Sequence, residues 1–279
     1  MTSELKGSAP LLPAPRTDAS PARAWPSGAC IVALGACAVF PIGAGVPVRT
    51  AAVGTAVLLL IVCAGVLRSS AAIRAAAFIG PLFGCFAVGT VGGWPPAVTT
   101  ALVCVVPLGC LLIAGRHAAL RPAVPWLTRG SVTPGTAWLG LATVVLSAVA
   151  LTAWALVVRP EPAEFLRELQ RLPLGLALLG IVAFALVNAV WEETLFRGVL
   201  LTELATVWGP KAAVTLQAVL FGAAHYGGFP SGITGMLMAG SWGLVLGILR
   251  VRSGGIRVSY LVHVAADTVI GTLAVLILR

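Results

Sequence analysis

The stretch Trp191-Glu192-Glu193-Thr194-Leu195-Phe196-Arg197 places two acids and one base inside an apolar run that extends from Leu172 almost to Val207. A charged side chain at the centre of a bilayer costs at least ~2.5–3.5 kcal/mol on insertion scales, so each of these groups needs a partner or a function. Glu193 and Arg197 are four residues apart with the acid first, the better order for an ion pair on a helix. Glu192 lies about 100° further round the helix and gains no partner from that pairing, which makes it the candidate for chemistry.

The composition is that of an integral membrane protein. Of the 279 residues, 59% are hydrophobic and 10% are charged, whereas soluble domains carry about 25% charged residues. The net charge of +9 is not accompanied by a basic face or by stacking aromatic residues, so nucleic acid is excluded as a partner. We therefore expect an all-α, polytopic transmembrane bundle of about eight or nine spans with an active-site cavity inside the membrane.

The chain divides into a tail and two groups of apolar runs. Residues 1–27 are rich in Ala, Pro and Ser and predict a disordered cytoplasmic tail. We expect residues 28–133 to form an N-terminal four-span bundle and residues 134–279, which hold the remaining runs, to form a second membrane domain. The predicted runs are 28–46, 51–67, 75–93, 97–115, 134–158, 173–206, 212–226, 232–249 and 258–278. An amphipathic segment at 160–171 predicts a helix on the outer membrane interface.

The distribution of positive charge predicts the orientation. With the tail inside, the inner segments contain twelve Lys and Arg residues and the outer segments contain five. This bias favours nine spans with a cytoplasmic N-terminus and an external C-terminus. The chain is also high in Ala, Gly and Arg and poor in Lys, as many bacterial sequences are, so we expect a bacterial plasma membrane.

Two histidines and one further acid lie in apolar runs. His225 follows small residues that leave room for water, and His263 and Asp267 are four residues apart, hence on one helix face. At ~1.5 Å per residue, these groups and Glu192 lie about 9–21 Å from the inner ends of their predicted helices, so three helices bring carboxylate and imidazole to similar depth. There Glu192 can act as a general base on a water that a histidine holds, and a remaining His/Asp pair can stabilise an oxyanion.

Three motifs in this order resemble those of the CPBP intramembrane proteases, a family of CAAX prenyl proteases and bacteriocin-processing, Abi-like proteins. They are Glu192-Glu193-x-x-x-Arg197, Phe221-x-x-x-His225 and His263-x-x-x-Asp267, and the resemblance covers about residues 134–279. It implies an endopeptidase in which Glu192 and His225 activate water and His263 and Asp267 form the oxyanion pair. By the same resemblance, Glu193, Arg197 and Phe221 are structural.

The sequence departs from the family at Asp267, because the last motif often ends in Asn. An ionised carboxylate there would repel an oxyanion, so Asp267 is either protonated or orients His263. Glu192, His225 and His263 also form a candidate His₂Glu zinc set. The usual His-Glu-x-x-His signature is absent, so we favour a glutamate-activated water with zinc as the alternative cofactor.

The expected substrate is a membrane-associated peptide or protein in the lipid bilayer. A bacteriocin-like peptide, an anti-sigma factor or a signalling peptide fits a bacterial chain better than a prenylated C-terminus. Two rival functions stay open. The first is a non-catalytic membrane immunity or scaffold protein. The second is a proton-coupled transporter, since buried carboxylates also serve proton relays.

Overall fold

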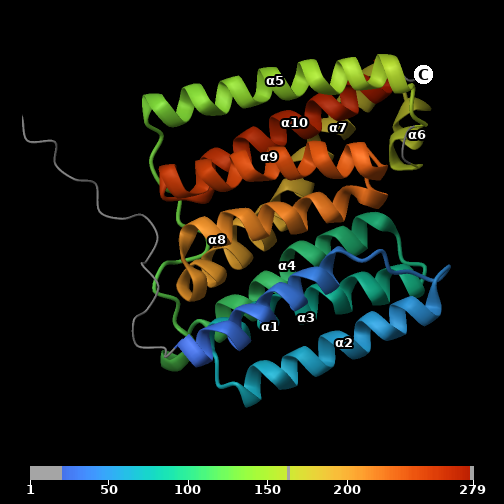
Figure 1. The fold of residues 1–279 in the computed structure, drawn as a ribbon. Helices are drawn as coiled ribbons and strands as arrows, with labels where there is room; N and C mark the ends of the chain where they lie inside the picture. Colours follow the sequence, from blue (N-terminus) through green and yellow to red (C-terminus); the bar gives the residue numbers. More distant parts are fainter. Residues whose placement is uncertain (1–20, 162–163, 277–279) are drawn as a thin grey trace, which may run out of the picture.

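The computed structural model describes residues 21–161 and 164–276, and all the regular elements in that part of the chain are helices. They are α1 (Pro21–Val39), α2 (Pro47–Val66), α3 (Ser70–Val91), α4 (Pro96–Ala114), η1 (Ala118–Leu120), α5 (Pro134–Val158), α6 (Glu164–Gln170), α7 (Leu174–Glu193), η2 (Thr194–Leu200), α8 (Leu201–Ala224), η3 (His225–Gly227), α9 (Gly232–Ser253) and α10 (Ile256–Leu276). Figure 1 shows the long helices side by side in one bundle. The predicted all-α membrane bundle is confirmed.

The predicted runs correspond to these helices, with two differences. One is the residue at which the first helix begins, and the other is the number of membrane spans. Helix α1 begins at Pro21, before the predicted start at residue 28, because proline is well placed in a first helical turn. Residues 1–20 of the predicted tail lie outside the described residues. By length and composition, seven helices in the described part can cross a membrane. That number leaves out the shorter Ala24–Val39 and treats Leu174–Gly227 as one stretch of 54 residues.

The stretch Leu174–Gly227 contains a reversal of the chain. Gly209 has φ 83° and ψ 166°, which interrupts the helical dihedrals within α8, and Pro210 cannot donate a backbone hydrogen bond across the break. Phe196 and Phe221 pack with ring centroids 4.9 Å apart, so the chain folds back between them. The single stretch therefore holds the two predicted runs 173–206 and 212–226.

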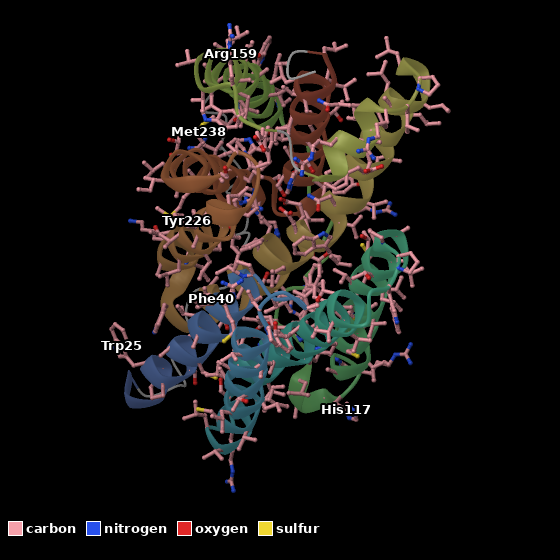
Figure 2. The ribbon with its side chains drawn as sticks, turned by 90° about the vertical axis from the view of Figure 1, so that its right-hand side faces the viewer. Trp25, Phe40, His117, Arg159, Tyr226 and Met238 are labelled. Atoms are coloured by element: carbon pink, nitrogen blue, oxygen red, sulfur yellow. The ribbon has the colours of Figure 1, made fainter. Side chains whose placement is uncertain are left out.

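The two parts of the bundle meet at α8. On one side α1 and α3 pack against α8, and on the other side α9 packs against it, while α10 packs against α7 and α5. Figures 1 and 2 show α1–α4 on one side of the molecule and α5–α10 on the other. The short helix α6 lies within the predicted interfacial segment 160–171 and contacts α7 and α10.

A buried ion pair joins the two parts. In α3, Arg74 donates from Nε to Oε1 of Glu203 in α8 at 2.8 Å, and Trp126 donates from Nε1 to the same oxygen at 2.7 Å. All three side chains are buried. Arg74 lies between the predicted runs 51–67 and 75–93, whereas the structure includes it in α3 and buries it against Glu203. Arg250, which follows the predicted run 232–249, is likewise fully buried in α9.

Removal of Arg74 tests the importance of this ion pair. The substitution Arg74→Leu leaves the Glu203 carboxylate buried without its guanidinium, so we expect the free energy of unfolding to fall by about 3–5 kcal/mol. The double variant Arg74→Leu with Glu203→Leu should recover most of that loss, since no unpaired charge remains. Thermal unfolding of the purified protein in detergent measures both. As a control, Arg171→Leu breaks the exposed pair with Glu168 and should change the unfolding temperature little.

The close approach of α8 to α9 gives a second prediction. A Cβ at Gly222 would lie 2.7 Å from the carbonyl oxygen of Met236 and 3.0 Å from Cα of Gly240, both on α9. We expect Gly222→Ala to push the two helices apart and to lower the unfolding temperature by about 2–6 °C. The matched control is Gly109→Ala in α4, where nothing lies within 4 Å of the added carbon. Equal unfolding temperatures for the two variants would contradict the argument.

Candidate active site

A cavity of about 670 Å³ lies among the helices of the C-terminal part. Its walls are mostly apolar side chains of α5, α7, α8, α9 and α10, and Ala38 is the one lining residue that the described N-terminal helices supply. Five side chains with an amide, carboxylate or imidazole group gather on its wall. They are Asn188, Glu192, His225, His263 and Asp267. The structure thus brings the predicted acids and imidazoles to one cavity.

The ion pair predicted within the first motif is present. Nη1 of Arg197 lies 2.8 Å from Oε1 of Glu193, and both side chains are almost fully buried. The Arg197 guanidinium carbon also lies 4.4 Å from the centroid of the Phe221 ring. The backbone around Arg197 forms a π-helix, Thr194–Leu200, a wider winding that occurs frequently at functional sites. Nothing in the apolar pattern of the sequence predicts this winding.

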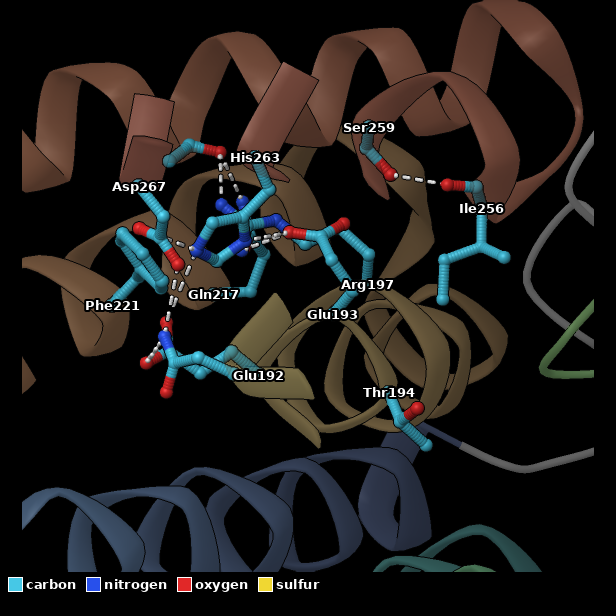
Figure 3. A network of polar contacts seen from close by, with 12 residues as sticks. Glu192, Glu193, Thr194, Arg197, Gln217, Phe221, Ile256, Ser259, His263 and Asp267 are labelled. Atoms are coloured by element: carbon cyan, nitrogen blue, oxygen red, sulfur yellow. Dashed lines mark hydrogen bonds and ion pairs between the residues drawn. The ribbon is translucent and has the colours of Figure 1, made fainter. Parts of the chain in front are cut away.

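His263 of α10 lies among three carboxylates. Its Nδ1 lies 2.9 Å from Oε1 of Glu193, as Figure 3 shows. Its Nε2 lies 3.5 Å from Oε2 of Glu192 and 3.7 Å from Oδ1 of Asp267. Both ring nitrogens therefore face carboxylate oxygens, and in the imidazolium form both carry a proton to donate.

The two oxygens of Glu192 have different surroundings. Oε1 accepts a hydrogen bond of 3.0 Å from Nδ2 of Asn188. Oε2 is buried and has no hydrogen-bond partner within the described residues. Glu192 lines the cavity, and of its two oxygens Oε2 is the one without a hydrogen bond in the described chain; it faces Nε2 of His263 at 3.5 Å.

His225 reaches the cavity from the end of α8. Its Nδ1 lies 2.9 Å from the backbone carbonyl oxygen of Phe221. A carbonyl only accepts, so Nδ1 carries the proton and Nε2 is left as an acceptor. Within the described residues, Glu192 makes its hydrogen bond with Asn188 and its ion pair with His263, and not with His225. The structure brings Glu192, His263 and Asp267 into one polar cluster, and His225 into the same cavity beside it.

The donor positions do not fit the candidate zinc set of Glu192, His225 and His263. In the part of the chain that the structure describes, no group of three or more His, Cys, Asp or Glu side chains is placed to hold a metal ion. Nδ1 of His263 is engaged by Glu193, and its Nε2 faces Glu192 and Asp267. We therefore derive no step that passes through a metal.

Sequence reasoning missed two polar members of the site. Asn188 bonds Glu192 and Asp267, and Trp191 donates from Nε1 to Oδ1 of Asn188 at 3.1 Å. A signal was present, because Asn188 is the only asparagine among 279 residues and lies one helical turn before Glu192. His117, to which the sequence gives no role, is exposed and lies at the edge of the molecule in Figure 2.

The comparisons with known proteins agree with the three motifs. Residues 173–269 match a family model described as type II CAAX prenyl endopeptidase, Rce1-like. The comparisons with curated proteins and with solved structures gave no significant match. The matched segment begins with α7 and includes Glu192, His225, His263 and Asp267. Residues 173–269 of this integral membrane protein thus match the family model of a type II CAAX prenyl endopeptidase, which supports the resemblance of the three motifs to the CPBP/CAAX proteases.

Proposed function

We propose that this protein is a membrane-embedded endopeptidase that hydrolyses peptide bonds of membrane-associated peptides or proteins. One observation carries the proposal most directly. A carboxylate whose Oε2 accepts no hydrogen bond within the described residues, that of Glu192, shares a mostly apolar cavity with His225 and His263. A mostly apolar cavity with a few convergent polar groups is the usual form of an active site.

The first step is the activation of water. A water bound between Oε2 of Glu192 and Nε2 of His225 gives its proton to the carboxylate, and the resulting hydroxide attacks the carbonyl carbon of the scissile bond. His225 holds the water as an acceptor, because its Nδ1 is occupied by the carbonyl of Phe221. Glu192 later returns the proton to the leaving amine, so the glutamate ends the reaction as it began.

The second requirement is stabilisation of the oxyanion that forms on the attacked carbonyl. The Nε2 edge of His263 donates to this oxygen in the imidazolium form. Glu193 holds the ring from the other side at 2.9 Å, which fixes its orientation. Asp267 acts through His263, because its Oδ1 lies 3.7 Å from Nε2 of that ring.

The cavity favours a substrate that presents apolar groups from the lipid phase. Leu146, Phe184 and Met238 line the walls, while the polar groups gather around Glu192. A prenylated C-terminus, which the family description names, and an unmodified hydrophobic peptide both fit this chemistry. We retain the cytoplasmic N-terminus as a prediction. We also retain residues 134–279 as the catalytic part, and the position of the cavity supports this second assignment.

The substitution Glu192→Gln tests the proposal. Glutamine keeps the size of the side chain but cannot take a proton from water, so we expect kcat for peptide cleavage to fall by about 10²–10⁴-fold. Mass spectrometry of peptide products, from membranes that carry wild-type or variant protein, measures the change and reports whether cleaved peptides are prenylated. The exposed Glu168→Gln on α6 is the matched control and should leave cleavage unchanged.

The same experiment separates the rival functions. A membrane scaffold or immunity protein would keep its function after Glu192→Gln and would yield no cleaved peptide from the wild type. A proton-coupled transporter would show flux driven by a pH gradient, again without cleavage. Either result would refute the proteolytic mechanism.

A metal-chelation experiment tests the choice of a glutamate-activated water. We expect treatment with a zinc chelator to leave the cleavage rate unchanged, because the donor positions do not form a three-ligand set. The measurement is cleavage of a peptide by purified protein, with and without chelator, together with the zinc content. Stoichiometric zinc with activity that is lost on chelation and restored by zinc would overturn this choice.

A further inference from the structure

We propose that Asn188 is a positioning residue that holds the carboxylates of Glu192 and Asp267 side by side and selects Oε2 of Glu192 as the proton-accepting oxygen. The catalytic part of this inference rests on the proposed function. The positioning part rests on the contacts alone.

The contacts of Asn188 use both N–H donors of its amide and one of the two lone pairs of its oxygen. Nδ2 donates to Oε1 of Glu192 at 3.0 Å and to Oδ2 of Asp267 at 3.2 Å. Oδ1 accepts a hydrogen bond of 3.1 Å from Nε1 of Trp191. An ionised carboxylate only accepts and an indole N–H only donates, so the amide has a single orientation that satisfies all three partners.

The amide of Asn188 reduces the repulsion between the carboxylates of Glu192 and Asp267. Glu192 belongs to α7 and Asp267 belongs to α10, so the packing of these two helices brings two acids together in a membrane bundle. Like charges at short range repel, and a buried carboxylate without a donor is costly. The two amide protons of Asn188 give one donor to each acid, which lets both lie on the same wall of the cavity.

The amide also makes the two oxygens of Glu192 unequal. Oε1 is engaged by Asn188, and Oε2 is buried 3.5 Å from Nε2 of His263 without a hydrogen-bond partner in the described chain. A base that is already bonded through one oxygen has little freedom to rotate, so the other oxygen is presented in a fixed direction. Few other side chains can do this at position 188. Alanine has no donor, and aspartate would add a further carboxylate next to Glu192 and Asp267.

An unfolding experiment tests the positioning part without any need for activity. We expect Asn188→Ala to lower the unfolding temperature by about 3–6 °C, because two acids lose their common donor. In the background Asp267→Asn only one of these acids remains and residue 267 can donate, so the same substitution should lower the temperature by less than half as much. Equal losses in both backgrounds would overturn the proposal, since simple loss of packing is additive.

A swap of the two groups tests the catalytic part. We expect Asn188→Asp to lower kcat for peptide cleavage by at least about 10-fold with little change in KM. The double variant Asn188→Asp with Asp267→Asn exchanges the amide and the acid, so it should recover at least about 3-fold of that loss. A double variant no more active than Asn188→Asp would overturn the proposal.

A control and a separation of outcomes complete the design. Thr152→Val removes a hydroxyl on α5 that donates to the carbonyl of Ala148 at 2.7 Å, outside the cavity wall, and should leave kcat and KM unchanged. If the wild type cleaves no peptide, the proposed function fails, and the unfolding experiment still decides whether Asn188 positions the two acids.

Discussion

A carboxylate inside a membrane bundle must be met by donors, and Glu193 is met by two. Arg197 reaches it from the π-helix η2, and His263 reaches it from α10. Removal of one partner from such a buried group costs about 3–5 kcal/mol, so the three side chains fix one another. The orientation of His263, and with it the direction of its Nε2 edge, thus depends on a residue that does not line the cavity.

The same constraint explains how the N-terminal helices serve the site. Glu203 lies on the continuation of the helix that carries Glu192 and Glu193, and it is held by Arg74 of α3 and by Trp126. One end of this continuous segment is therefore clamped to the N-terminal bundle and its middle is clamped to α10. The first four long helices supply Ala38 to the cavity wall, and they contact the segment that carries Glu192 through the Arg74–Glu203 pair.

Motif spacing predicted the pairing within the site, because residues four apart on a helix face the same way whatever surrounds them. The Glu193–Arg197 pair follows from that rule alone. Depth counted along each helix also placed His225 near Glu192, but a count along the axis says nothing about rotation around it. The depth count therefore did not predict that Nδ1 of His225 faces the carbonyl of Phe221. It also did not predict the contact of Asn188 with Asp267, which depends on the packing of α7 against α10.

Two adjacent glutamates have different surroundings, because Glu193 is paired with Arg197 next to the Phe221 ring whereas Glu192 lines the cavity. Phe221 contacts the Arg197 guanidinium at 4.4 Å and the His225 ring at 4.5 Å, measured to its centroid. Phe221 lines the cavity, whereas Glu193 and Arg197 do not. The ring covers the ion pair and keeps it in a medium of low polarity, where the pair is strong and inert. Only Glu192, about 100° further round the helix, is left to meet water.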